Sequence, residues 1–395
     1  MHIPLASSAQ CVPSSRIREL ADLAFALPDV LKLHFGESNL PTPEFIKEAA
    51  RKALDEGYTF YTENAGLLSL REALARKYLE LHRVSLDPSS EIVVTASGVQ
   101  ALHLAIRLAL NPGDEALLLT PAWPNGSAIV RMCSAHAKEI PLQLSGKHYV
   151  IDYDALESAV TRNTKLLVYT SPSNPLGWMA NHNDQQKLLD FARRHHLWLL
   201  ADEVYERICY KAPVAPSILR SCTREDAVLV VQSFSKSYCM TGWRLGWLVG
   251  RKDAARKATQ LNEFVVSHAP SMAQKAGETA LLKGETTIHS MLKKYKDQLD
   301  FCRQSLSSIK VLELPEPEGA FYLFPRIQGL KDSFALCKSL LHEKKVSLAP
   351  GVAFGMGGEG SVRICFAADR SVLEPALSRL AEFLKAWKTN REDFP

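Results

Sequence analysis

The chain has 395 residues, enough for two domains that each bury a core of their own. Its 46% hydrophobic and 23% charged residues are ordinary for a globular protein, and a dispersed net charge of +4 does not indicate a partner nucleic acid. No secretory signal pattern opens the chain, and no apolar run reaches membrane-spanning length. Eight scattered cysteines without zinc-site spacing predict reduced thiols and a cytoplasmic location.

The N-terminal part of the chain predicts helices. Ser14 is placed to cap a helix that runs to about Leu27. Further helices are expected at 44–56 and 67–82. Gly36 lies in the proline-rich connection between the first two helices. A glycine there allows the backbone to approach a ligand closely, although a simple turn would explain it equally well.

From residue 91 onward, apolar runs and helical patterns alternate. The runs expected to be buried strands are 92–95, 116–120, 165–170, 197–201 and 227–232. This alternation predicts an open, mostly parallel sheet with helices on both faces, which is an α/β fold. The run 244–250 follows the preceding strand too closely for a helical crossover, so it is expected to be antiparallel.

The pattern changes after about residue 283. A long helix to residue 307 is followed by short strands and two more helices, which predicts a second, smaller α/β domain. The N-terminal segment is too short to fold alone, so we expect it to pack with this domain. The predicted division is therefore a large domain at 44–283 and a small domain made of 1–43 and 284–395.

Polar and aromatic residues follow the predicted strands at the points where the strands end. In open α/β sheets, ligands bind outside the carboxyl ends of the parallel strands. Five strand ends therefore direct such residues toward one crevice. These residues are Ser97, Gly98, Trp123, Asn174, Asp202, Tyr205, Ser233, Ser235 and Lys236.

Lys236 is the most informative of these residues. A lysine at the end of a buried strand is readily desolvated, and a desolvated ammonium loses its proton and can form a Schiff base with a carbonyl. Ser233, Ser235 and Arg244 supply hydrogen-bond donors and a positive charge that suit a phosphate ester. An aldehyde that carries a phosphate describes pyridoxal phosphate (PLP). On this motif alone, a surface loop with a solvated lysine is an equally good interpretation.

The other strand ends offer groups that suit the same molecule. A helix that begins near Gly98 has free N–H groups for a phosphate. Asp202 can pair with a ring nitrogen, and Asn174 and Tyr205 can hydrogen-bond a phenolic oxygen. Trp123 can stack on the ring. The alternatives are a helix cap for Asp202, a turn residue for Asn174 and a core position for Trp123.

Arg363 lies in an apolar segment of the predicted small domain. Its planar guanidinium matches the geometry of a substrate α-carboxylate. A strand position that faces solvent would explain the residue equally well, because alternate strand residues point outward.

With these residues collected, the chain resembles the class I/II aminotransferases of the PLP fold-type I (aspartate aminotransferase-like) superfamily, over roughly residues 17–384. The resemblance rests on several short motifs in the expected order. They are Ser-Phe-Ser-Lys-Ser-Tyr-Cys-Met-Thr-Gly-Trp-Arg-Leu-Gly at 233–246, Ala-Asp-Glu-Val-Tyr at 201–205, Ser-Pro-Ser-Asn-Pro at 171–175, Ser-Gly-Val-Gln at 97–100, Tyr-Thr-Glu-Asn-Ala-Gly-Leu-Leu-Ser-Leu-Arg at 61–71, Pro-Gly-Val-Ala-Phe-Gly at 350–355 and Val-Arg-Ile at 362–364.

The resemblance implies a mostly parallel sheet of about seven strands, PLP as cofactor and a role for each matching residue. Lys236 forms the Schiff base and later moves the substrate proton, Asp202 pairs with the pyridinium, and Asn174 and Tyr205 hold the phenolate. The resemblance assigns phosphate binding to Ser97, Gly98, Val99, Ser233, Ser235 and Arg244, ring stacking to Trp123, and the substrate carboxylate to Gly36 and Arg363. Tyr61 is implied to reach the phosphate of a neighbouring subunit, hence a homodimer with shared active sites.

Val99 bears on the substrate, because some aspartate-using relatives carry a lysine at this position for a distal carboxylate. Its absence favours transfer from a neutral or aromatic L-amino acid to a 2-oxo acid such as 2-oxoglutarate. Two alternatives stay open: an aspartate aminotransferase with dicarboxylate specificity, and a PLP-dependent carbon–sulfur β-lyase. A PLP-sensing regulator would need a DNA-binding helix-turn-helix region, for which the residues before Leu31 are too few.

Overall fold

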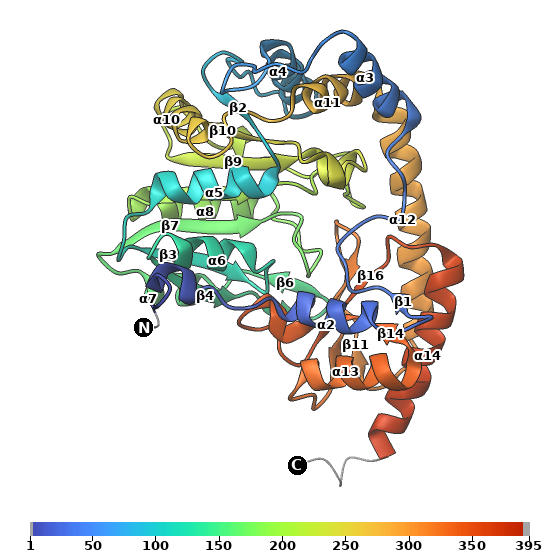
Figure 1. Cartoon of the computed structure of the whole chain (residues 1–395). Helices are drawn as coiled ribbons and strands as arrows, with labels where there is room; N and C mark the ends of the chain where they lie inside the picture. The colour runs from blue at the N-terminus through green and yellow to red at the C-terminus, as the bar shows by residue number, and fades with distance from the viewer. Residues whose placement is uncertain (1–2, 390–395) are drawn as a thin grey trace.

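The computed structural model describes residues 3–389 and centres on a seven-stranded sheet with the order β2-β10-β9-β8-β7-β3-β4 (Figure 1). Its strands are β2 (Ile92–Thr95), β3 (Glu115–Thr120), β4 (His136–Pro141), β7 (Thr164–Thr170), β8 (Trp198–Asp202), β9 (Val228–Ser233) and β10 (Gly246–Gly250). Strand β10 is antiparallel to both of its neighbours, and the other pairs are parallel. The predicted sheet and its single antiparallel strand are confirmed. The edge strand β4 was not predicted, because its sequence His-Ala-Lys-Glu-Ile-Pro mixes polar and apolar residues.

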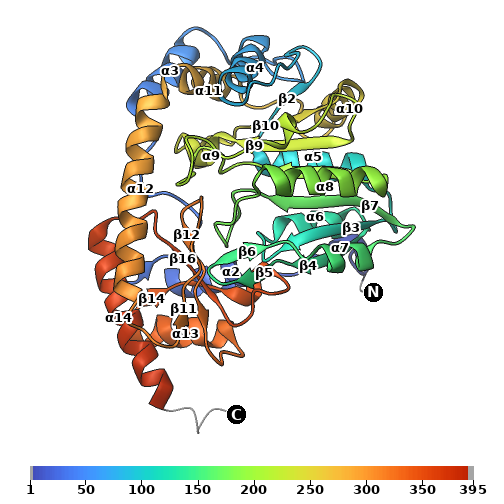
Figure 2. The same cartoon turned by 180° about the vertical axis from the view of Figure 1, so that it is seen from behind.

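Helices cover both faces of this sheet: Figure 1 shows α5 in front of the strands, and Figure 2, from behind, shows α8 there. Successive strand residues point to opposite faces, so Val93 and Val94 of β2 belong to two different cores. The helices of this part are α3 (Glu44–Asp55), α4 (Leu68–His82), α5 (Gly98–Ala109), α6 (Asn125–Met132), α7 (Tyr153–Ala159), α8 (His182–Arg194), α9 (Phe234–Ser237), α10 (Lys252–Glu263) and α11 (Ser271–Lys283).

A smaller α/β region follows, and the long helix α12 runs along the side of the molecule toward it (Figure 2). Its elements are α12 (Glu285–Leu306), β11 (Leu312–Glu313), β12 (Tyr322–Leu323), β13 (Arg326–Ile327), α13 (Ser333–Lys344), β14 (Val346–Ser347), β15 (Ala349–Pro350), β16 (Val362–Cys365) and α14 (Arg370–Thr389). Leu20, Ala24 and Leu33 from the N-terminal segment share its core. The division into domains at residues 43/44 and 283/284 stays a prediction.

The N-terminal segment contains α1 (Ser7–Gln10), α2 (Arg16–Phe25) and β1 (Leu31–Lys32), and β1 pairs in parallel with β14. Ser15, rather than the predicted Ser14, caps α2: its Oγ accepts a hydrogen bond from N of Arg18 at 3.3 Å. The helix ends before Leu27, since the residue that precedes a proline disfavours helical geometry. The remaining elements are the hairpin β5 (Gln143–Ser145) and β6 (His148–Val150) and the short 3-10 helices η1 (Ile218–Arg220), η2 (Thr241–Trp243) and η3 (Gly351–Phe354).

No disulfide joins any of the cysteines within residues 3–389. Within residues 3–389, no group of histidine, cysteine or acidic side chains is arranged to hold a metal ion. In the same range, no helix combines the length and the apolar character that crossing a membrane requires.

Candidate active site

A cavity of about 1610 Å³ lies where the parallel strands of the large sheet end. Every residue predicted for the site lines this cavity, except Tyr61. The lining includes Gly36, Ser97, Gly98, Val99, Trp123, Asn174, Asp202, Tyr205, Ser233, Ser235, Lys236, Arg244 and Arg363. The fold thus brings together residues that lie up to about 330 positions apart, since Gly36 and Arg363 line the same cavity. The role of each residue stays a prediction.

Lys236 enters the cavity from the short helix α9, directly after β9. Its Nζ donates a hydrogen bond to the carbonyl oxygen of Gly36 at 2.5 Å. Burial lowers the pKa of Lys236 to about 8, an effect that Arg363 reinforces and Cys365 opposes. Near neutral pH, a usable fraction of this amine is therefore unprotonated and nucleophilic.

Asp202 is the last residue of β8 and is buried at the base of the cavity. Burial raises the pKa of Asp202 to about 6, while a hydrogen bond from N of Val204 at 3.3 Å and the charge of Lys236 act in the opposite direction. That single long hydrogen bond, among those of the described residues, leaves most of the carboxylate's acceptor capacity unused. The site thus holds a carboxylate that is suited to a cationic N–H partner.

A polar rim, made of Ser97, Gly98, Val99, Ser233 and Ser235, lies at the ends of β2 and β9. Ser97 caps α5, its Oγ accepts from N of Gln100 at 3.2 Å, and its φ of +116° is a conformation that side chains rarely adopt. Ser233 Oγ donates to Ser235 Oγ at 2.9 Å. The first N–H groups of α5 face the same space, since a Cβ on Gly98 would stand 3.0 Å from Cβ of Ser233. This rim can bind an anion through backbone and hydroxyl donors.

Arg244 stands beside this rim. Its backbone is left-handed, with a φ of +53°, and its Nη1 donates to the carbonyl oxygen of Thr241. The side chain is exposed and faces no carboxylate within ion-pair range among the described residues. It can therefore direct its remaining donors to an anion on the rim.

Arg363 projects from β16 and is only 2% exposed. This burial rules out a strand position that faces solvent. Its Nη1 donates to Oδ1 of Asn174 at 2.8 Å, and its Nη2 donates to the carbonyl oxygen of His34. The rings of Tyr322 and Phe354 lie 4.7 Å and 5.0 Å from the guanidinium carbon. Arg363 is thus held in place at the wall of the cavity, and no carboxylate of residues 3–389 forms an ion pair with it.

Tyr205 lies three residues after Asp202, and its hydroxyl is 2.7 Å from that of Tyr322. Burial raises the pKa of Tyr205 well above its ordinary value, so the phenol is protonated and able to donate a hydrogen bond. Tyr61 differs from the other predicted residues. It is 89% exposed, and its ring meets that of His268 with centroids 5.6 Å apart, away from the cavity of its own chain.

The amino-acid sequence matches a known protein family over most of its length. The family described as "Aminotransferase class I and II" matches residues 28–380. The chain belongs to the class I/II aminotransferases. Like other members, this aminotransferase depends on PLP.

Its relatives cover almost the whole chain. It is 32% identical to an aspartate aminotransferase of Pyrococcus horikoshii, over 97% of this chain and 98% of that protein. It is also 32% identical to aromatic-amino-acid aminotransferase 2 of Thermococcus litoralis, over 97% and 99% of the two chains. The solved aspartate aminotransferase of Thermus thermophilus (single mutant 1) is 30% identical and superimposes with a TM-score of 0.90, over 97% of this chain and 100% of that one.

The described residues of the aminotransferase fit PLP. The buried, sparsely hydrogen-bonded Asp202 suits the pyridine N–H, and the polar rim at α5 and β9 suits the phosphate. Lys236 reaches the space between them as an amine of lowered pKa, which suits the aldehyde.

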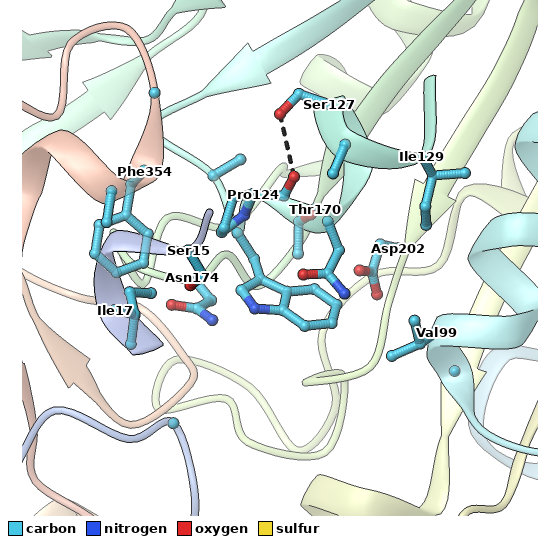
Figure 3. A pocket seen from close by; sticks show the side chains of 18 of the residues that line it. Ser15, Ile17, Val99, Pro124, Ser127, Ile129, Thr170, Asn174, Asp202 and Phe354 are labelled. Carbon is cyan, nitrogen blue, oxygen red and sulfur yellow. Dashed lines mark hydrogen bonds between the residues drawn. The ribbon is translucent and has the colours of Figure 1, made fainter. Parts of the chain in front are cut away.

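The cavity also contains residues that sequence reasoning missed. Figure 3 shows Ile17 and Phe354 on one side of it and Asp202 and Val99 on the other. Ile17 has the spacing of an apolar residue on the buried face of its helix, and no local pattern distinguishes a core position from a cavity wall. Phe354 lies inside a motif of the resemblance, 350–355, to which no role was attached.

Proposed function

We propose that this aminotransferase moves the amino group of a neutral or aromatic L-amino acid to a 2-oxo acid such as 2-oxoglutarate. The observation that carries the proposal is that Lys236, with a pKa lowered to about 8, faces one cavity together with the buried Asp202 and Arg363. An unprotonated amine, a carboxylate for the cofactor ring and a guanidinium for the substrate are the three groups that the reaction needs.

When bound, PLP supplies an electrophilic aldehyde and a ring that accepts electrons from the substrate α-carbon. Lys236 is the base and acid that moves the proton at that carbon, and Asp202 keeps the ring nitrogen protonated. Tyr205 and Asn174 donate to the phenolic oxygen. The residues of the polar rim, Ser97, Gly98, Val99, Ser233 and Ser235, would bind the phosphate together with Arg244, and Trp123 would stack on the ring.

The substrate end of the site combines one fixed charge with an apolar wall. Arg363, oriented by Asn174 and His34, binds the α-carboxylate beside Gly36. Ile17, Val99 and Phe354 line the same cavity, and this apolar lining favours a donor with a neutral or aromatic side chain.

A dicarboxylate donor is the second candidate, and two arginines support it. Arg18 from α2 and Arg131 from α6 both line the cavity, and among residues 3–389 neither has a carboxylate within ion-pair range. A guanidinium at the edge of a binding site suits a distal carboxylate of a substrate. The same pair would also serve an acidic acceptor such as 2-oxoglutarate in a site whose donor is neutral.

A homodimer with shared active sites forms part of the proposal. Phe60, Tyr61 and Phe264 are 80%, 89% and 86% exposed, and the Tyr61–His268 ring contact joins the two segments that carry them. Exposed aromatic side chains gathered in this way favour a protein interface. Val265, beside Phe264, lines the cavity, so an interface here would reach the active site. Cysteines that form no disulfide within residues 3–389 support the predicted cytoplasmic location.

The proposal is tested by mixing the purified PLP-loaded protein with single L-amino acids and following the visible absorption of the cofactor by stopped flow. We expect one turnover with neutral or aromatic donors, and continuous turnover only when a 2-oxo acid is present. Continuous turnover without an oxo acid, with release of pyruvate, would instead indicate a carbon–sulfur β-lyase. A preference for aspartate and glutamate as donors would favour the second candidate.

Lys236→Ala provides the essential control. We expect the variant to fold, to bind PLP without the covalent link and to lose turnover by about 10⁶-fold, a loss typical of removing the reacting group of an active site. Wild-type rates in this variant would disprove the assignment.

A further inference from the structure

Tyr322, on β12, is fully buried. It contacts residues that line the active-site cavity, although it does not line the cavity itself. The hydroxyl lies 2.7 Å from that of Tyr205. The ring lies 4.7 Å from the guanidinium carbon of Arg363, and β12 pairs with β16, which carries that arginine. Tyr322 is therefore in contact with two residues that the proposed function uses, one at the cofactor and one at the substrate carboxylate.

The glycine at position 36 is required by the same hydroxyl. A Cβ on Gly36 would stand 2.4 Å from the hydroxyl oxygen of Tyr322 and 3.3 Å from the ring carbon that bears it. Gly36 has no left-handed backbone, so space rather than backbone conformation demands the glycine. The carbonyl oxygen of Gly36 in turn accepts the hydrogen bond from Lys236. One buried hydroxyl thus determines the residue type beside the reacting amine.

The number of hydroxyl protons decides which of the two tyrosines donates the hydrogen bond between them. A tyrosine hydroxyl has one proton to donate. If Tyr205 donates its proton to the phenolic oxygen of PLP, the bond between the tyrosines must be donated by Tyr322. Hydrogen bonds in such a series strengthen one another, so the Tyr322 hydroxyl makes Tyr205 a better donor.

We propose that Tyr322 is a positioning residue that acts through Tyr205: its hydroxyl donates to Tyr205 and thereby stabilises negative charge on the phenolic oxygen of the cofactor. This inference rests on the proposed function, because it needs PLP in the cavity with its phenolic oxygen at Tyr205. Without the Tyr322 hydroxyl, the phenolic oxygen holds the proton that it shares with the Lys236 nitrogen more tightly. The pH at which the bound cofactor changes colour should therefore rise.

The test compares Tyr322→Phe with the wild type by titrating the visible absorption of the PLP-loaded protein between pH 5 and 10. We expect the apparent pKa of the chromophore to rise by about 0.5–1 unit in the variant, the size expected for one hydrogen bond that acts through another. Tyr78→Phe is the matched control: Tyr78 is also fully buried, and its hydroxyl accepts a hydrogen bond from Nε1 of Trp247 at 3.1 Å, outside the cavity lining. It should leave the chromophore pKa at the wild-type value.

Gly36→Ala is a second test that also measures the chromophore pKa. It can be used if Tyr322→Phe does not fold. The added methyl group displaces the Tyr322 hydroxyl, so it should also raise the chromophore pKa. Combined with Tyr322→Phe, it should add little, because the hydroxyl that it displaces is already absent. Additive shifts would mean that Gly36→Ala acts through Lys236 and not by displacing the Tyr322 hydroxyl, which would overturn the link between Gly36 and Tyr322.

The remaining outcomes separate this inference from the proposed function. If the wild type takes up PLP and Tyr322→Phe titrates like it, the proposed role of Tyr322 is wrong and the proposed function stands. If the wild type takes up no PLP, the proposed function itself fails. A Tyr322→Phe variant with an unchanged chromophore pKa but a lowered melting temperature would assign Tyr322 a purely structural role.

Discussion

The guanidinium of Arg363 donates to the side-chain oxygen of Asn174 at 2.8 Å, although the two residues are 189 positions apart. The group proposed to bind the substrate carboxylate is therefore fixed by a group proposed to contact the cofactor ring. Both are buried, so this bond is protected from competing water. A substrate that binds to Arg363 is held at a defined distance from the ring.

Arg363→Lys should raise KM for the amino donor and lower kcat/KM by about 10²-fold. A lysine cannot bond a carboxylate, Asn174 and the His34 carbonyl oxygen at once, and a lost charged hydrogen bond costs about 1.5–3 kcal/mol. Steady-state kinetics with the best donor provides the measurement. The visible spectrum of the bound cofactor should stay unchanged, and an unaltered KM would contradict the role of Arg363.

Asp202→Asn should have two effects. It should lower kcat by about 10³-fold, because the carboxylate that pairs with the cofactor ring is lost. It should also stabilise the cofactor-free protein. The pKa of Asp202 is raised to about 6 from 3.8, so the native state binds more protons than the unfolded state between these values. Asp202 therefore destabilises the cofactor-free fold as the pH rises through that range, by about 3 kcal/mol at most. Urea unfolding at pH 4 and pH 7.5 measures this, and equal slopes of stability against pH in both proteins would refute it.

Gly246→Ala should destabilise the fold by about 3 kcal/mol and weaken PLP binding. The added Cβ would stand 2.5 Å from N of Gly98 and 2.7 Å from O of Gln232, and backbone atoms cannot rotate away. Gly242→Ala is the matched control, because a Cβ there meets nothing within 4 Å. Thermal unfolding and PLP titration of both variants provide the comparison, and similar losses in the two would show that crowding at Gly98 is not the cause.

A buried ion cluster should make the fold sensitive to acid. Burial would raise the pKa of Glu206, but Lys77 and His82 outweigh it and lower the pKa to about 2. Its contribution to stability is present above pH 4.5 and is lost as the pH falls from there toward 2, by about 3 kcal/mol.

Glu206→Gln should cost about 3–5 kcal/mol at pH 7, because the buried Lys77 loses the carboxylate with which it pairs, and should flatten the acid limb of the stability profile. Glu157→Gln, at a surface pair that is 43% exposed, should cost less than about 1 kcal/mol. A stability profile of Glu206→Gln that still falls steeply below pH 4.5 would show that other groups dominate.

The sequence was most informative where a strand ends in a polar residue. Asp202 and Lys236 each follow an apolar run, and the topology rule for parallel sheets was enough to bring them to one edge. Arg363 was ambiguous, because alternation along a strand does not reveal whether both faces are covered. Its burial depends on Tyr322 and Phe354, which reach it through tertiary packing alone.

Other features had no local signal at all. The glycine at 246 is demanded by the backbone of Gly98, which is 148 positions away, and the one at 36 by a hydroxyl from β12. Ile17 has the spacing of a core residue, yet it faces the cavity. Contacts of this kind depend on how two separate segments pack against each other. The periodicity of apolar residues within either segment does not predict that packing.

The N-terminal segment has a practical consequence. α1 packs against α6, Sγ of Cys11 donates to the carbonyl oxygen of Arg131, and the first turn of α2 lines the cavity. These residues form part of the wall around the reacting groups. Removal of α1 and the first turn of α2 is therefore expected to alter the measured substrate range, so assays of donor preference should use protein that retains these residues.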